Sequence, residues 1–273
     1  MDITFDQILK LLLYFIIYSF LGWVVESIFK TILSKKWVNS GFLYGPFCPI
    51  YGFGAIIMMI TFNPIKQNFL LVFIMAFIIL SIWEYIAGWL LEKKFDTKYW
   101  DYSDNFLNIN GRVCLMNSIF WGILGVLFIS IIHPYIQGYV NMLKQDSLIF
   151  FDIIFSIVMG ADAIITTMHI KSFDSTLQSI KELGENIKQK IIELKDTGKL
   201  LNESEVDKIK TNEKLIEELK QKQAILKFKL YKQMSRLKLA FPKMKSEKIS
   251  NFLNQKIEFK ELKEKIRKKF KNI

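Results

Sequence analysis

Apolar residues fill the first two thirds of the chain in runs, and five of these runs have, or nearly have, the length of a membrane-spanning helix. A transmembrane helix needs roughly 20 residues that are mostly apolar. The pattern predicts an all-α, polytopic bundle of about five spans in a transmembrane domain of residues 1–171, with the spans over residues 8–29, 46–62, 69–91, 113–133 and 148–170. The second run is short, since about 17 residues at a rise of 1.5 Å each reach only about 25 Å, so a re-entrant segment is the alternative there.

Beyond residue 171 the apolar residues become sparser and recur at every third or fourth position. One such stripe ends before the sequence DTGK, and a second ends before Pro242. This spacing is typical of amphipathic helices. The sequence therefore predicts that residues 172–273 form a cytoplasmic, coiled-coil-like helical hairpin followed by a basic third helix over residues 247–270.

Charge separates the same two parts of the chain. The residues from Lys171 onward hold 27 of the 37 Lys and Arg and 15 of the 26 Asp and Glu, which gives this part about +12 and the preceding part about −1. Basic residues accumulate in the cytoplasmic loops of membrane proteins. With five spans, most basic residues share a side with the tail, so we expect a multi-pass protein of the cell membrane with its N-terminus outside and its tail in the cytoplasm. Asp2 and Asp6 stand where a cleaved signal peptide carries basic residues, so we expect the first run to be a retained anchor.

The basic charge of the tail has three explanations. Solvated helix faces need no further function, and contact with anionic lipid headgroups at the inner leaflet is the second explanation. Nucleic-acid binding is not expected, because few aromatic residues lie among the lysines. The segment KEKIRKKFK is the candidate for lipid contact, through Lys265, Arg267, Lys268 and Lys269.

Polar side chains lie inside the predicted spans. The expected topology places Glu26, Glu84 and Asp162 in the cytoplasmic halves of spans one, three and five. A charge in hydrocarbon costs at least about 2.5 kcal/mol, so such acids normally face protein or water. Arg112 enters the fourth span from the same side, and we expect it to pair with Glu26 or Glu84 in a polar cavity open to the cytoplasm. The candidate substrate or ion cavity comprises Glu26, Asn39, Tyr51, Glu84, Asp101, Arg112, Asn117, Ser118 and Asp162. The alternative is a structural role for each acid, for example a pair between Glu26 and Lys30.

The stretch NSGFLYGPFCPIYGFGA, residues 39–55, interrupts the apolar pattern with glycines and prolines. Backbone groups that are freed at membrane depth need protein or a watery cavity beside them. Discontinuous helices of this kind form substrate and ion sites in transporters. The predicted broken-helix backbone comprises Gly41, Gly45, Pro46, Pro49 and Gly52. A tight surface turn before an ordinary helix is the alternative.

The sequence lacks motifs for metal or nucleotide chemistry. Cys48 and Cys114 have no metal-like spacing, and His133 and His169 lie near opposite ends of their predicted spans. Neither HExxH nor GxxxxGK[ST] occurs. We therefore expect no metal, no cofactor and no enzymatic activity. An intramembrane enzyme that uses paired acids on a lipid is the alternative.

The chain also resembles a known family. The resemblance rests on five motifs that occur in order between Tyr14 and His169, namely YSFLGWVVESIFK, NSGFLYGPFCPIYGFGA, WEYIAGWLLEKKF, YWDYS and NGRVCLMNSIFWGILG. Together they resemble the bacterial ABC-transporter type IV permease family, also called CmpB-like integral membrane proteins. The basic tail resembles an extension of some bacterial members.

This resemblance implies a membrane permease of unknown substrate. Because the chain has no nucleotide-binding motif, ATP hydrolysis would come from a separate ATPase subunit. Five spans would be few for one translocation path, which implies a homodimer or a coiled-coil partner. The alternative from another functional class is a membrane-anchored scaffold that acts through its basic tail.

Overall fold

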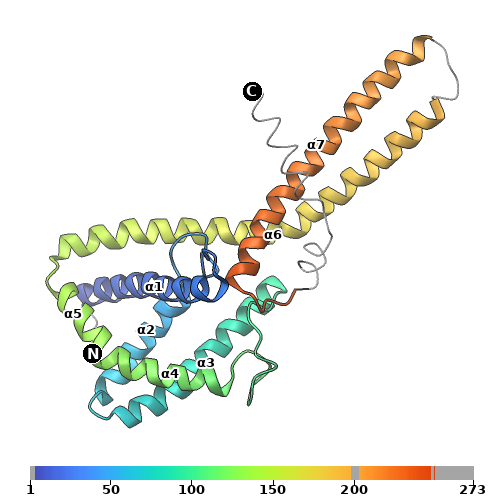
Figure 1. The fold of residues 1–273 in the computed structure, drawn as a ribbon. Coiled ribbons are helices and arrows are strands. Elements are labelled where there is room, and N and C mark those ends of the chain that lie inside the picture. Colours follow the sequence, from blue (N-terminus) through green and yellow to red (C-terminus); the bar gives the residue numbers. More distant parts are fainter. Residues whose placement is uncertain (1–3, 198–202, 247–248, 250–273) are drawn as a thin grey trace. The chain divides into compact units, whose positions relative to one another are not determined.

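The computed structural model of the chain describes residues 4–197, 203–246 and 249, and every regular element in this part is a helix (Figure 1). In chain order the elements are α1 (Phe5–Ser34), α2 (Pro49–Phe62), the 3-10 turn η1 (Asn63–Ile65), α3 (Phe69–Phe95), α4 (Leu115–Leu127), the π-helical turn η2 (Phe128–Ile132), α5 (His133–Asn141), α6 (Gln145–Thr197) and α7 (Glu203–Ala240). The predicted all-helical class is confirmed for these residues.

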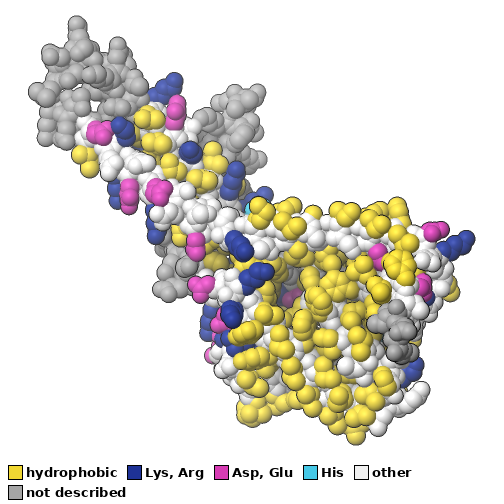
Figure 2. Space-filling view, turned by 180° about the vertical axis from the view of Figure 1, so that it is seen from behind, with side chains coloured by type: hydrophobic (Ala, Val, Ile, Leu, Met, Phe, Trp, Pro, Cys, Tyr) yellow, Lys and Arg dark blue, Asp and Glu magenta, His cyan; other side chains and the backbone are white. Residues whose placement is uncertain are grey.

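Four helical stretches of the described residues are long and apolar enough to cross a membrane. They are Phe5–Ser34, Phe69–Phe95, Leu115–Asn141 and Gln145–Glu193, while Pro49–Ile65 is a shorter apolar helix. Figure 2 shows the broad apolar surface on one face of the molecule. Large apolar surfaces of this kind fit a membrane protein. The count of five spans stays a prediction, because it depends on the short helix.

The second predicted span begins too early. α2 begins at Pro49, with Cys48 as its N-cap, whereas residues 37–48 contain bends but no helix. Proline suits the first helical turn, because its missing N–H would have no helical partner there. Pro49 and Gly52 are therefore helical. The helix is interrupted between the end of α1 at Ser34 and Pro49, and we call residues 37–48 the unwound segment.

Two other helices run further than the sequence predicts. The fourth span starts at Leu115 and continues through the π-helical turn to Asn141. The fifth does not end near residue 170, since α6 is one helix of 53 residues. No proline lies between Gln145 and Thr197, so the change from apolar to polar composition does not interrupt the helix.

The chain divides into two compact units. Of the described residues, the first comprises residues 4–167 and 236–246, and the second comprises residues 168–197, 203–235 and 249. The change in composition predicts that everything after residue 171 belongs to the tail. Residues 236–246 instead group with the first unit, so the chain returns to that unit after the hairpin.

Helix packing in the first unit depends on small side chains. α1 packs against α2, and α3 packs against α4. A Cβ at Gly52 would overlap with Ser19 of α1, and one at Gly125 would overlap with Ala76 of α3. Because small residues let helix backbones approach closely, these contacts allow tight packing around a core that includes the fully buried Phe62.

In the second unit α6 and α7 lie side by side. The Gln223 side chain donates a hydrogen bond to the Ile180 carbonyl (2.9 Å), and Ile187, Ile216 and Leu230 are buried. Both arms of the predicted hairpin are therefore helical, whereas its cytoplasmic location and its coiled-coil character stay predictions.

The end of the predicted tail is outside the described part of the chain. This applies to Lys265, Arg267, Lys268 and Lys269 and to all of the predicted third helix except Ile249.

Candidate functional site: polar clusters around the unwound segment

The unwound segment is tied back to α1 by side chains of both elements. The Trp23 indole donates to the Asn39 side-chain oxygen (2.7 Å), and the Asn39 amide group donates to the Tyr44 carbonyl (2.7 Å). The Ser40 N–H donates to the Ser27 hydroxyl at 3.1 Å. Asn39, a predicted site residue, thus links Trp23 of α1 to the Tyr44 carbonyl within the unwound segment.

Asp162 of α6 binds the backbone of the unwound segment. Its carboxylate accepts from the N–H groups of Tyr44 (3.1 Å) and Gly45 (2.8 Å), and from the Thr166 hydroxyl at 3.2 Å. A Cβ at position 45 would lie 2.8 Å from the carboxylate, so glycine permits this approach. Asp162 therefore compensates the N–H groups that the missing helix leaves free.

Arg236 of α7 binds the same segment through its carbonyl groups. One terminal nitrogen donates to the Leu43 carbonyl (2.8 Å) and more weakly to the Gly41 carbonyl (3.4 Å), while the other donates to the Phe42 carbonyl (2.8 Å). Gly41 has a φ of +88°, which glycine adopts without strain. An acid and a base thus hold opposite polar groups of one backbone stretch.

Glu84 of α3 forms the centre of a second cluster. Its side chain is buried and accepts hydrogen bonds from the Trp121 indole (2.9 Å), the Asn117 amide (3.2 Å) and the Tyr102 hydroxyl (3.3 Å). Among the described residues, no Lys or Arg forms an ion pair with it. Burial and then the nearby carboxylate raise the pKa of Tyr102, so its hydroxyl stays protonated and remains a donor.

Ser118 lies one residue after Asn117, but its contact is with a different residue of α3. The hydroxyl groups of Ser81 and Ser118 are 2.6 Å apart. Hydroxyl bonds of this kind join helices in membrane proteins. The structure thus brings Glu84 and Asn117 together directly, while Ser118 joins α3 to α4 nearby.

Tyr51 of α2 lies between α1 and the Glu84 cluster. Its ring packs where a Cβ at Gly22 of α1 would be, and its centroid is 6.2 Å from that of Trp121. A cavity of about 20 Å³ beside it is lined by Ile50, Tyr51, Gly54, Met58, Leu80, Trp83, Trp121 and Leu124. That volume holds about one water molecule, so this conformation leaves no room for a substrate there.

Glu26 forms the ion pair with Lys30 that is the structural alternative for this acid. It pairs with Lys30 at 2.6 Å, and the Cys48 thiol lies 3.6 Å from its other oxygen. Lys30 also donates to the Ala240 carbonyl and lies 4.9 Å from the centroid of the Phe241 ring. This cluster therefore connects α1 to the residues that return after the hairpin.

The expected pairing of Arg112 with Glu26 or Glu84 is wrong. Arg112 instead bonds to the Glu92 carboxylate (2.8 Å) and to the Tyr85 hydroxyl (3.1 Å). The reason is local, because Arg112 precedes α4 and its side chain lies along the last turns of α3.

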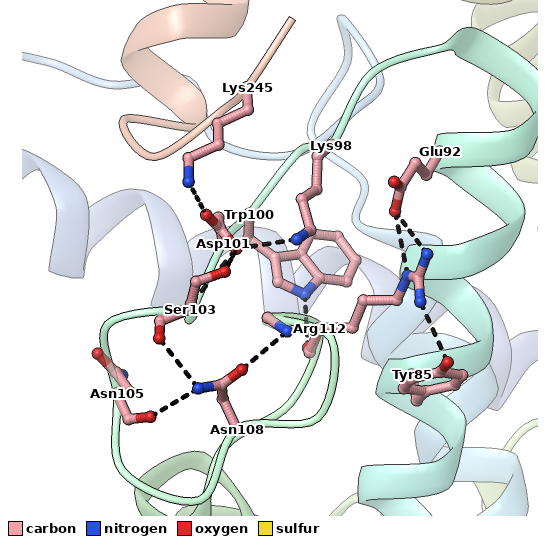
Figure 3. A network of polar contacts seen from close by, with 11 residues as sticks. Tyr85, Glu92, Lys98, Trp100, Asp101, Ser103, Asn105, Asn108, Arg112 and Lys245 are labelled. Carbon is pink, nitrogen blue, oxygen red and sulfur yellow. Dashed lines mark hydrogen bonds and ion pairs between the residues drawn. The ribbon is translucent and has the colours of Figure 1, made fainter.

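Asp101 belongs to a loop network that Figure 3 shows with its neighbours. Its buried carboxylate accepts from Ser103 (2.6 Å) and Lys98 (2.9 Å) and pairs with Lys245. Lys98 and Lys245 also exchange two backbone hydrogen bonds (3.0 and 2.8 Å). Burial opposes ionisation of Asp101, but bonds from Lys245, Ser103 and Lys98 outweigh it and hold its pKa well below the ordinary range.

Several charged residues of these clusters, Lys98 among them, were not predicted as site residues. Arg236 and Lys245 stand among many other basic residues, and Glu92 is near the end of its span, so nothing in the pattern distinguishes them. Asp152 of α6 is different, because an acid inside a predicted span is itself a signal. It is buried, and neither of its carboxylate oxygens has a hydrogen-bond partner among the described residues.

The described residues contain no group of three or more His, Cys, Asp or Glu side chains that could hold a metal ion. What they contain is a buried carboxylate held by neutral donors, and a helix interruption held by two charged side chains. Such groups can bind a cation or a proton, and they can form and break with a change of conformation.

Comparison with known proteins gives one match. The sequence model of a family described as "Putative ABC-transporter type IV" matches residues 13–167. No curated protein and no solved structure matches the chain. The matched range contains the five motifs and the Glu84 cluster, and it ends within α6, before α7 begins.

Proposed function

Because the chain belongs to this family of ABC-transporter type IV proteins, we propose that it is the membrane permease subunit of a transporter for a small polar substrate or an ion. The match covers residues 13–167, which is more than half of the chain and includes most of the first unit. The predicted family membership is confirmed, whereas the permease role is our proposal.

The observation that carries the proposal is the Glu84 cluster. Within the described part of the chain, this buried carboxylate has three neutral donors and no paired cation, and the cost of burying such a group in a membrane supports a functional role for it. Trp121, one of its donors, lines with Tyr51 a neighbouring cavity of about 20 Å³, which is about the volume of one water molecule. We propose that this is the closed state of a site that opens when α2 moves with the unwound segment.

The arrangement in the membrane follows from the charge pattern. We propose five crossings, with Pro49–Ile65 as the short second span, the N-terminus outside and the hairpin in the cytoplasm. ATP hydrolysis would come from a separate chain, because GxxxxGK[ST] does not occur here. A second copy would complete the translocation path.

The first test is co-purification from native membranes. The intact chain, solubilised in mild detergent, is expected to elute with an ATPase in a fixed ratio. The purified complex is then reconstituted and its ATP-driven transport is screened with a panel of labelled ions and small polar solutes. Absence of any ATPase in the eluate would contradict the proposed subunit role.

A second test uses Glu84→Gln, with Glu92→Gln as the matched control on the same helix. Glu92 is paired with Arg112 and its side chain is 37% exposed, so its loss leaves the buried cluster intact. We expect transport to fall at least tenfold in the first variant and to stay near normal in the second. Equal transport by Glu84→Gln and the unmodified protein would reject the site.

A shortened hairpin separates a transporter from a scaffold. A truncation after α6 would also remove Arg236 and Lys245, which hold the first unit together. Gly184 and Gln223 face each other, so a short Gly/Ser linker can replace residues 185–222. A transporter keeps measurable flux in this variant, whereas a scaffold that recruits its partner through the hairpin loses its function.

A further inference from the structure

Three consecutive backbone carbonyls of the unwound segment converge on one guanidinium group. The carbonyls of Gly41, Phe42 and Leu43 accept from the two terminal nitrogens of Arg236 at 3.4, 2.8 and 2.8 Å. The Tyr44 ring covers the same group, with the guanidinium carbon 4.5 Å from the ring centroid. We call these three carbonyls and this ring the carbonyl cage.

The carbonyl cage matches the shape of a guanidinium group. Its acceptors are divided between two nitrogens of a planar fork, and its aromatic face attracts a flat, delocalised cation. An ammonium group is a compact point charge and cannot span these acceptors in the same way. Asp162 binds the neighbouring N–H groups of Tyr44 and Gly45, which places a negative charge behind the cage.

The carbonyl cage satisfies the two terminal nitrogens of Arg236 but not its Nε atom. The Nε atom of Arg236 is buried and has no hydrogen-bond partner among the described residues. A buried donor without an acceptor costs free energy. The cage therefore complements the terminal guanidinium, while the third nitrogen of the side chain is left unsatisfied.

We propose that the carbonyl cage is a recognition site for small guanidinium-bearing cations, and that Arg236 fills this site from within the chain. The inference goes beyond the proposed transport role and does not depend on it. It predicts that removal of the Arg236 side chain leaves a vacant site that free guanidinium can enter.

The test is chemical rescue of Arg236→Ala in the full chain, purified in detergent. Thermal unfolding is followed at 0 to 50 mM guanidinium chloride, which is far below denaturing concentrations, and equal concentrations of ammonium and sodium chloride serve as salt controls. We expect the melting temperature of the variant to recover by about 2 °C or more in a saturable manner with guanidinium alone. The unmodified protein should not respond, because its site is filled.

Two further variants control for specificity. Lys30→Ala also removes a cation, which lies beside the Phe241 ring, the Glu26 carboxylate and the Ala240 carbonyl. This position offers one backbone carbonyl instead of three, so guanidinium should have no advantage over ammonium there. The double variant Arg236→Ala/Tyr44→Ala lacks the ring and should lose most of the rescue. Equal responses of Arg236→Ala to guanidinium and ammonium would overturn the proposal.

A second route applies if Arg236→Ala does not yield folded protein. Arg236→Lys keeps a charge but not the fork, so free guanidinium should compete with the lysine and raise the melting temperature selectively. The absence of this selectivity would equally overturn the proposal.

Discussion

Glu84 and Asp101 are both buried carboxylates of the first unit, with 5% and 4% of their surface exposed, yet their surroundings differ. Asp101 is paired with two lysines, one of which comes from the residues that follow the hairpin. In the part of the chain that the structure describes, Glu84 has three neutral donors and no ion pair. The difference suggests two roles, because a carboxylate paired with lysines joins the loops that carry them, whereas a buried carboxylate held by neutral donors fits the ligand site proposed above.

The largest expected effect is that of Asp101→Ala. The change leaves Lys98 and Lys245 without their shared carboxylate and removes the acceptor of Ser103. We expect a loss of about 2–3 kcal/mol in unfolding free energy, measured by thermal unfolding in detergent, since both lysines can still reach water. Asp104→Ala is the control, because Asp104 is exposed and should change stability little. Equal effects of the two changes would remove the distinction between anchor and surface acid.

Glu84→Gln should affect stability less than Asp101→Ala. Glutamine keeps one acceptor oxygen for Trp121 but turns an NH₂ group toward another donor, so about 1 kcal/mol is expected to be lost. Thermal unfolding measured beside transport checks this. A melting temperature as low as that of Asp101→Ala would assign Glu84 a mainly structural role.

Acidification should reduce the contribution of Asp101 to the stability of the fold. Its folded-state pKa lies below the ordinary value of 3.8, so its stabilisation is complete above that pH and is lost as the pH falls toward the folded-state pKa. The difference in melting temperature between the unmodified protein and Asp101→Asn should therefore be constant from pH 7 to about pH 5 and shrink below about pH 4. A difference that grows on acidification would contradict the assigned ion pairs.

The smallest effect is expected for Glu92→Gln. The Glu92 side chain is 37% exposed, so its pair with Arg112 is screened by solvent and contributes about 0–1 kcal/mol. A melting curve within about 1 °C of the unmodified protein would agree with this. A loss as large as that of Asp101→Ala would mean that the Arg112 pair is a second anchor.

The helical fold could be predicted because its signals are local. Apolar runs predict long helices, and they gave α1 and α3 to within a few residues of their observed bounds. The end of the fifth span could not be predicted, because a change from apolar to polar composition does not by itself end a helix. A helix without proline can continue through such a change, as α6 does.

The site was also predictable in part, because some of its signals are local. An acid inside an apolar run is visible in the sequence, so Glu84 and Asp162 were found, as was the interruption by Gly41 and Gly45. Their partners depend on tertiary contacts. Arg236 binds residues about 195 positions away, and one arginine in a lysine-rich helix carries no local sign of that contact.

The return of residues 236–246 to the first unit makes the hairpin an insertion with both ends fixed in the same body. Lys245 pairs with Asp101 at one end, and Asp162 lies just before the hairpin at the other. In evolutionary terms, the arms can lengthen or shorten by matched turns without disturbing that body. A relative without the insertion would need other donors for the carbonyls of Gly41, Phe42 and Leu43, and the residue types that it places near them should differ accordingly.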